Sequence, residues 1–163
     1  MILNTDQVMQ VLPHRDPFLF IDSVESVTIP GRTLAPGEVV DVKEIIGSEV
    51  VAHYRTKKDH AIFKGHFPDF PILPGVVQVE MMAQATSFVV FIMHKNPMEM
   101  KMDVALLAIT EAKFRKPVLP EMDLKIVTRI LKLRGPIITT ECKLYHNDQL
   151  MSEAMVMASL KMQ

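Results

Sequence analysis

The stretch from Gly75 to about His94 constrains the fold of this chain most, because it is apolar on almost every side of a helix. Side chains at helical spacing trace two opposite faces, with Val76, Val79, Met82, Ala83, Thr86, Val90 and Met93 on one and Val77, Met81, Phe88 and Phe91 on the other. A helix that is apolar all round is buried rather than amphipathic. Asn96-Pro97 ends the pattern, so the rest of the chain is expected to enclose one central helix.

Segments with the composition of β-strands occur on both sides of this helix in the sequence. Those before it are 18–24, 38–43 and 48–56, and those after it are 104–114, 123–134, 136–146 and 149–162. Turn dipeptides separate several of them, at Pro30-Gly31, Pro36-Gly37 and Asn147-Asp148. Asn4 and Gln7 have capping-box spacing and predict a short helix that ends before Pro13. The pattern predicts an α+β fold, an antiparallel sheet wrapped around a buried helix, as one domain spanning residues 1–163.

Composition and charge argue against several classes of protein. With 48% hydrophobic residues the chain can bury a substantial core, and its net charge of −1 gives no field that favours nucleic acid. The single Cys142 excludes an intrachain disulfide, and without a Cys/His cluster at ligand spacing no metal site is expected. The N-terminus lacks the pattern of a signal peptide, and the longest uninterrupted apolar run, 88–93, is too short to span a bilayer. We therefore expect a soluble, cytoplasmic protein that contacts neither membrane nor nucleic acid.

The connection from 57 to 75 is long, polar at its start, and then interrupted by Pro68, Pro71 and Pro74. These prolines leave little room for regular backbone hydrogen bonding. Long structured loops inside compact domains tend to be functional. This loop contains His66, and Glu80 follows it within the first two turns of the apolar helix.

His66 and Glu80 each have a functional and a purely structural interpretation. A carboxylate at Glu80 loses hydration among Val, Met and Phe side chains unless a partner compensates, which favours a functional role. Alternatively, Glu80 lies on one exposed edge of the helix together with Gln78 and Gln84. His66 alone is equally consistent with a packed loop residue, and His14 is better explained as fixing the turn into the first strand than as a chemical group. The residues alone leave these alternatives open.

Several motifs identify a family resemblance. They are Leu12-Pro13-His14-Arg15 with Pro17-Phe18-Leu19, then Gly65-His66-Phe67-Pro68, then Pro74-Gly75-Val76 with Glu80, Met82, Ala83 and Gln84, and last Lys113-Phe114-Arg115-Lys116-Pro117-Val118 with Pro120. Their order and extent resemble the 3-hydroxyacyl-acyl-carrier-protein dehydratases of bacterial type II fatty acid synthesis, which have the hot-dog fold. The match covers most of the chain, and its most specific part is 65–84. Glu80, where a related isomerising type has Asp, indicates the non-isomerising type.

The resemblance implies that His66 of one subunit and Glu80 of the other form a catalytic pair across a dimer, with the thioester carbonyl bound by the Gly75 amide. Free N–H groups and the dipole at a helix start favour developing negative charge, which agrees with the role of Gly75. Neutral His66 would take the α-proton as general base. Glu80, protonated or holding a water, would deliver a proton to the departing β-hydroxyl. Apolar surroundings raise the pKa of a carboxyl group, so a proton-bearing Glu80 is expected, and no metal or organic cofactor is required.

The resemblance also implies partners and binding residues. An apolar slot for the acyl chain is expected from Phe67, Ile72, Leu73, Val76 and Val79, with Gln84 as a further substrate-binding residue, although each of the five is alternatively a core residue. Because the family's acyl carrier protein is acidic, a basic landing site is expected among Lys64, Lys113, Arg115, Lys116, Lys132 and Arg134. The expected assembly is a homodimer as the minimal unit, arranged as a trimer of dimers, and unpaired sheet edges favour such association.

The match departs from the family in three places. The segment 30–47 is longer, Pro120-Glu121-Met122-Asp123 stands where the family has Pro-Gly-Asp, and Ala-Leu-Leu at 105–107 stands where an aromatic gate is common. These departures leave the chemistry intact and leave chain-length preference and pathway open. The alternatives are a hot-dog acyl thioesterase and an inactive acyl-thioester-binding subunit. A mere binder gains nothing from a desolvated carboxylate, so the presence of both His66 and Glu80 argues against the inactive subunit.

Overall fold

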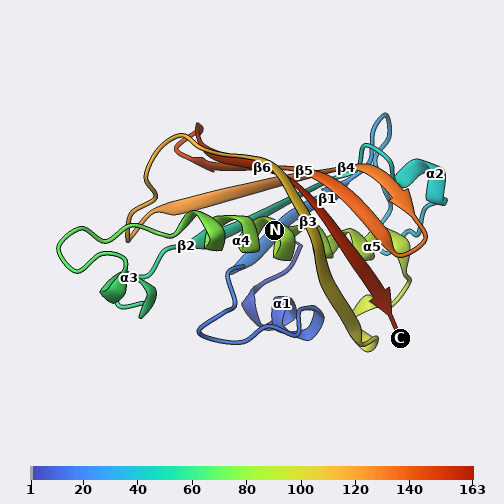
Figure 1. Cartoon of the computed structure of the whole chain (residues 1–163). Coiled ribbons are helices and arrows are strands. Elements are labelled where there is room, and N and C mark those ends of the chain that lie inside the picture. Colours follow the sequence, from blue (N-terminus) through green and yellow to red (C-terminus); the bar gives the residue numbers. More distant parts are fainter. Residues whose placement is uncertain (1) are drawn as a thin grey trace.

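The computed structural model describes residues 2–163 and contains a six-stranded antiparallel sheet with one long helical segment against it (Figure 1). The strands are β1 (Ser23–Thr28), β2 (Glu49–Arg55), β3 (Met102–Phe114), β4 (Asp123–Arg134), β5 (Ile137–His146) and β6 (Gln149–Met162). The helices are α1 (Thr5–Val11), α2 (Val42–Ile45), α3 (Ile62–Gly65), α4 (Gly75–Thr86) and α5 (Val90–Met93), with 3₁₀ turns η1 (Ser87–Val89) and η2 (Pro97–Glu99). The α+β fold expected from the sequence is confirmed.

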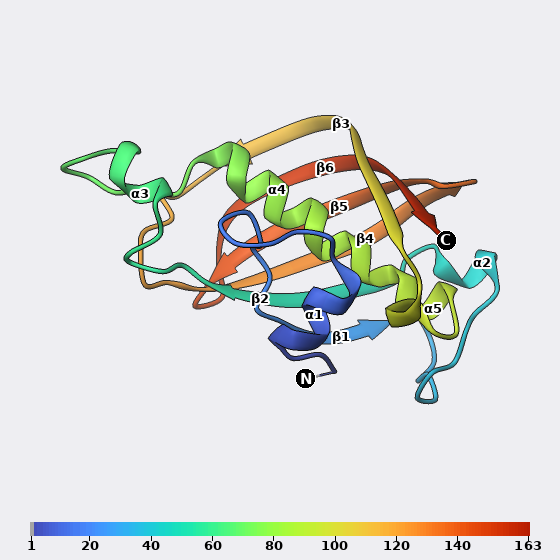
Figure 2. The same cartoon turned by 90° about the horizontal axis from the view of Figure 1, so that it is seen from below.

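The sheet has the strand order β1-β2-β4-β5-β6-β3, so β1 and β3 are its edges. Figure 2 shows α4 lying across one face of the sheet, with α1 beside it. The three C-terminal strands match the sequence-based bounds closely because each shows regular alternation of buried and more exposed residues. Asn147 and Asp148 join β5 to β6 with φ values of 48° and 61°, as the hairpin motif predicts.

The central helix is buried as its apolar composition predicts. Met81, Met82 and Phe88 are fully inaccessible to solvent and form the middle of the core. Taken as a whole, Gly75–Met93 is long and apolar enough to cross a membrane, but 78% of the tested window lies inside the fold. The apolar run 88–93, used above to judge whether the chain could span a bilayer, therefore understates the length of the apolar helix. Its burial is that of a core helix.

The first strand begins later than the sequence predicted. Residues 18–22 lie outside any strand, and β1 starts at Ser23. The reason is the side chain of Gln84, which accepts a hydrogen bond from the Phe20 N–H at 2.9 Å and donates one to the Phe18 carbonyl at 2.9 Å. These backbone groups are therefore unavailable to a neighbouring strand. The segment is instead fastened to α4.

The strand predicted at 38–43 is also wrong. Asp41 begins the short helix α2 with a capping box, in which its carboxylate accepts from the Lys43 N–H and the Glu44 side chain accepts from the Asp41 N–H. Arg32 pairs with Glu38 at 2.6 Å and with Glu44 at 2.9 Å, folding the segment back on itself. The capping pattern at Asp41 was present in the sequence and outweighs the Val-rich composition. The capping box at Asn4, by contrast, forms as predicted.

Glu121 occupies a backbone conformation that favours glycine, with φ at 64°. It lies in the turn where the resembled family has Pro-Gly-Asp, and its N–H donates to the Thr56 carbonyl at 2.8 Å. We expect Glu121→Gly to raise the free energy of unfolding by roughly 0.5–1 kcal/mol, because left-handed strain is removed. Denaturant melts of this variant and of Glu121→Ala measure the effect. The alanine control keeps the strain, so an equal gain from both variants would contradict this explanation.

Candidate active site

The loop that carries His66 is closed by its own backbone. Ile72 donates to the His66 carbonyl at 2.8 Å, and Phe67 and Phe70 exchange two hydrogen bonds of 3.0 and 3.1 Å. The His66 ring stacks on Phe67 with centroids 4.2 Å apart. Its Nδ1 lies 2.9 Å from the Ile72 carbonyl oxygen. Because a carbonyl only accepts, Nδ1 carries the proton and Nε2 keeps a lone pair, as a general base requires.

The Gly75 end of α4 lies beside His66. Two of the first N–H groups of the helix, those of Val77 and Gln78, donate to the Pro74 carbonyl at 3.1 and 3.2 Å. The amides of Gly75 and Val76 have no backbone acceptor within residues 2–163. A Cβ on Gly75 would lie 2.8 Å from Cε1 of Phe114, so a larger residue at position 75 would require the Phe114 ring to move. Free amide groups and the helix dipole therefore meet at a site that suits a developing oxyanion.

Glu80 lies one and a half turns further along α4 and is held through a single oxygen. Its Oε1 accepts from Nε2 of Gln84 at 2.9 Å and lies 3.3 Å from Nε2 of His14. Its Oε2 makes no hydrogen bond to any residue in 2–163. The carboxylate thus has one anchored oxygen and one free oxygen. The side chain is 22% exposed, so the exposed-edge interpretation of Glu80 does not describe its surroundings.

The pKa of Glu80 is lower than its ordinary value. Burial raises it, but hydrogen bonds from His14 and Gln84 together with the charge interaction with His14 outweigh that effect. The sequence-based expectation of a proton-bearing Glu80 considered only the apolar surroundings of the helix. It is corrected here, because two donors from the N-terminal loop and from α4 itself stabilise the ionised form.

His14, which the sequence analysis explained as fixing a turn, contacts Glu80 across 66 positions of sequence. Arg15 holds this loop, because its guanidinium donates to the carbonyls of Met9, Leu12 and His14. The occurrence of His14 within a motif that matches the resembled family was the feature that pointed to it.

His66 and Glu80 line two different hollows of the same chain. One, of about 150 Å³, is lined by Pro13, His14, Glu80, Ala83, Gln84, Ser87, Val104, Leu106 and Ala158. The other, of about 530 Å³, is lined by His66, Ile72, Leu73, Pro74, Gly75, Val76, Gln78, Phe114, Arg115, Lys116 and Pro117. Within a single chain, His66 and Glu80, which the family resemblance pairs across a dimer, therefore lie in separate hollows.

The residues expected to bind the acyl chain do not form one surface. Ile72, Leu73 and Val76 line the His66 hollow, where Val76 is 78% exposed. Val79 is 3% exposed and packs in the core. Phe67 is half-exposed and stacks on His66. The polar atoms of Gln84 are fully engaged in fastening the N-terminal loop and Glu80.

The expected basic site is divided between two ends of the sheet. Lys113, Arg115 and Lys116 lie at the end of β3 near the His66 hollow, although Arg115 pairs with Glu153 at 3.3 Å. Lys64 belongs to α3, directly before the His66 loop. Lys132 and Arg134 lie opposite Thr139 and Ile137 of β5, at the other end of the strands. They are too distant to join one landing site on a single chain.

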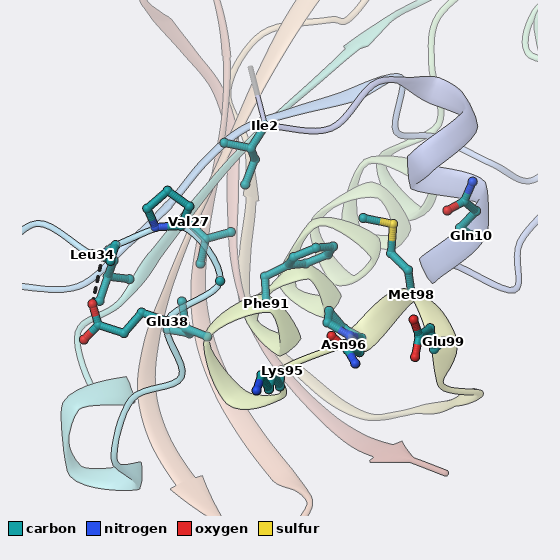
Figure 3. A pocket seen from close by; sticks show the side chains of 15 residues that line it. Ile2, Gln10, Val27, Leu34, Glu38, Phe91, Lys95, Asn96, Met98 and Glu99 are labelled. Atoms are coloured by element: carbon teal, nitrogen blue, oxygen red, sulfur yellow. Dashed lines mark hydrogen bonds between the residues drawn. The ribbon is translucent and has the colours of Figure 1, made fainter.

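A larger cavity of about 780 Å³ lies at the far end of the central helix (Figure 3). Phe91 and Met98 project into it, and Leu34 and Glu38 close one side from the long 30–47 segment. Phe91 follows Ser87, which lines the Glu80 hollow, by one helical turn. The segment 30–47 thus forms one wall of a mainly apolar cavity. This cavity lies further along the side of the central helix that carries Glu80 and Ser87.

Cys142 does not supply a nucleophile. It is fully buried, and burial raises the pKa of its thiol to about 12. Within residues 2–163, no three His, Cys, Asp or Glu side chains are arranged to hold a metal ion.

Solved structures place this architecture in a known class. A chain of the dehydratase heterocomplex ApeI:P from Xenorhabdus doucetiae superposes with a TM-score of 0.66 at 16% identity, covering 99% of this chain and 93% of that chain. A mutant thioesterase from Pseudomonas aeruginosa gives 0.61 at 13% identity, covering 100% of this chain and 97% of that chain. The fold is the hot-dog fold.

Sequence relatives define the family more narrowly. The FabA-like domain model matches residues 12–155. A 3-hydroxyacyl-[acyl-carrier-protein] dehydratase FabZ from Clostridium perfringens is 35% identical over 137 residues, which is 83% of each protein. The FabZ of Sulfurovum sp. is 31% identical over 163 residues, which is 98% of each. The chain belongs to the FabA-like family, with 3-hydroxyacyl-[acyl-carrier-protein] dehydratases of the FabZ type as its curated relatives.

Proposed function

We propose that this protein dehydrates 3-hydroxyacyl groups on acyl carrier protein to the trans-2-enoyl products of fatty acid biosynthesis. The observation that carries the proposal is a pair of complementary half-sites. Within residues 2–163, Nε2 of His66 and the nearby amides of Gly75 and Val76 have no hydrogen-bond partner, and neither has Oε2 of Glu80. FabZ relatives at 31–35% identity support the same activity. The thioesterase alternative rests on fold likeness alone, at 13% identity.

The active unit is proposed to be a homodimer in which His66 of one subunit faces Glu80 of the other. Its support is the edge strand β3, where Leu106, Leu107 and Ile109 are 43–49% exposed on a free edge. Apolar edge strands of this length associate with a partner strand. A trimer of such dimers in the cytoplasm, each chain being one domain of 163 residues, completes the proposed assembly.

In the proposed reaction, the amides at Gly75 and Val76 polarise the thioester carbonyl, which acidifies the α-carbon. Nε2 of His66 takes the α-proton. The free Oε2 of Glu80 accepts a hydrogen bond from the β-hydroxyl and orients it. The C–O bond then breaks, and the proton that His66 gained leaves with the hydroxyl as water. Atoms and charge balance without a cofactor.

One assay tests the proposed function. The protein is incubated with a 3-hydroxyacyl thioester on acyl carrier protein while the absorbance of the conjugated enoyl product and free thiol are followed together. Enoyl formation without thiol is expected. Thiol release would indicate the thioesterase, and the absence of both would indicate an inactive binding subunit. Weaker turnover of Lys113→Glu with carrier-bound substrate, and not with a short thioester mimic, would locate the carrier at the His66 end.

Chain-length preference is proposed to depend on the large cavity. The proposed route of the acyl chain runs past Glu80 and Ser87 to Phe91, whose ring projects into the space in Figure 3. We expect Phe91→Ala to raise kcat/KM for long acyl chains over short ones by about tenfold, since pocket contacts of this size discriminate to that degree. Competition between two chain lengths measures the ratio. Val42→Ala, on the exposed helix α2 outside the lining of this cavity, is the control, and an unchanged ratio for Phe91→Ala would contradict this route.

A further inference from the structure

His14 contacts the carboxylate at the centre of the proposed chemistry. It lies in the loop between α1 and β1, and its Nε2 is 3.3 Å from Oε1 of Glu80. The two side chains are 21% and 22% exposed, so water only partly competes for this contact. A polar contact that is mostly shielded from water fixes geometry more firmly than an exposed one.

The other ring nitrogen of His14 determines which tautomer is present. Nδ1 is buried and has no hydrogen-bond partner within the described residues. A proton on Nδ1 would therefore leave a buried donor unpaired, which costs more than an unpaired aromatic acceptor. The proton belongs on Nε2, which lies 3.3 Å from Oε1 of Glu80.

The loop that presents His14 is itself held in place. Nη1 of Arg15 donates to the His14 carbonyl at 2.6 Å and to the Leu12 carbonyl at 2.8 Å. Gln84 fastens the following residues, through Phe18 and Phe20, to the same helix that carries Glu80. The backbone is therefore held on both sides of His14, which limits where its imidazole can lie.

His14 and Gln84 both approach Oε1 of Glu80 and leave Oε2 without a partner in the described chain. No other titratable side chain lines this hollow, whose remaining walls come from Pro13, Ala83, Gln84, Ser87, Val104, Leu106 and Ala158. Two polar contacts on one oxygen restrict the rotation of the carboxylate, and the other oxygen keeps its lone pairs available for a ligand.

We propose that His14 is a positioning residue that donates from Nε2 to Oε1 of Glu80, so that Oε2 is presented to the β-hydroxyl of the substrate. The expected effect of His14 on kcat rests on the proposed dehydration, whereas its contact with Glu80 does not. The contact itself makes the N-terminal loop part of the active site, although the loop supplies no group to the reacting atoms.

Two substitutions separate a donor role from ring packing. His14→Phe keeps an aromatic ring and removes the donor, whereas His14→Gln keeps an N–H near the same place. We expect His14→Phe to lower kcat about tenfold or more with little change in KM, since a misplaced catalytic group costs rate rather than binding. His14→Gln is expected to restore most of kcat. His53→Phe, which breaks a 2.6 Å contact with Glu25 on the sheet, is the matched control without effect.

A second readout does not depend on turnover. Titration of the Glu80 side-chain carboxyl, followed by its ¹³C resonance, reports the contact directly. His14→Phe is expected to raise the titration midpoint by about one pH unit, because a hydrogen bond to the ionised form is lost and burial remains. His14→Gln should lie near the wild type.

The two readouts keep the inference and the proposed function distinguishable. A wild-type protein that forms no enoyl product would refute the proposed function, while a shifted Glu80 midpoint in His14→Phe would still support the contact. Wild-type kcat and an unshifted midpoint in His14→Phe would overturn the inference. So would a His14→Gln variant that behaves like His14→Phe, because the role would then be packing and not donation.

Discussion

Glu80→Gln is expected to lower kcat for dehydration by about 10²–10⁴-fold while leaving the melting temperature almost unchanged. Gln keeps the size of the side chain but removes the negative charge that orients the β-hydroxyl through Oε2. The fold is spared because Glu80 is partly exposed and contributes no apolar packing. Because the pKa of Glu80 is lowered, the wild-type carboxylate stays ionised at neutral pH and is lost as an acceptor only when the pH falls through that lowered value.

His66→Ala is expected to show a loss of the same order, since the α-proton then has no base. Matched controls remove the same residue types from an exposed pair elsewhere, Glu25→Gln and His53→Ala, which contact each other at 2.6 Å. Single-turnover rates and melting curves of all four variants check the prediction. A Glu80→Gln enzyme within threefold of wild type would remove Glu80 from the mechanism.

Gln84→Leu is expected to lower the free energy of unfolding by about 2–3 kcal/mol and to reduce turnover together with it. The side chain is 1% exposed and makes three hydrogen bonds, to the N–H of Phe20, the carbonyl of Phe18 and Oε1 of Glu80. Leu would leave the buried Phe20 N–H without a partner, and it would release both the N-terminal loop and the carboxylate.

Gln78→Leu is the matched control on the same helix. Gln78 is 3% exposed, but it makes one hydrogen bond of 3.2 Å, to the Leu73 carbonyl, and its Oε1 has no partner within the described residues. Its loss is expected to cost less than about 1 kcal/mol. Urea melts of both variants measure the two losses in free energy of unfolding. Equal losses would show that burial of the amide, rather than the hydrogen bonds of Gln84, determines the destabilisation.

The central helix and the C-terminal strands were predictable because their periodicity is local. Each strand from β4 to β6 alternates over at least nine residues, and Gly75–Met93 is apolar on most sides. The structures of segments 18–24 and 38–43 were not predictable, because their composition is typical of strands. Their structure depends instead on a side chain distant in sequence in one case and on a polar capping residue in the other. In the first case Gln84 occupies the backbone, and in the second the Asp41 capping box starts a helix.

The site was predictable in its residue types and less so in its electrostatics. The motif between 65 and 84 predicts His66, Glu80 and Gly75 as site residues, and their catalytic roles stay predictions. The protonation of Glu80 was not predictable, because it depends on a donor 66 positions away that only the folded loop brings near. The same limit applies to the basic residues, which sheet register separates.

The central claim is that each active site combines one subunit's His66 with the other subunit's Glu80. Co-expression of His66→Ala and Glu80→Ala chains, each with a different affinity tag, followed by sequential purification on both tags, isolates assemblies that contain both chains. Each hybrid dimer in them would contain one intact site and one doubly damaged site, so activity far above that of either single variant is expected, up to about half of the wild-type kcat per dimer. Hybrids no more active than the single variants would place both groups in the same subunit's site and contradict the account.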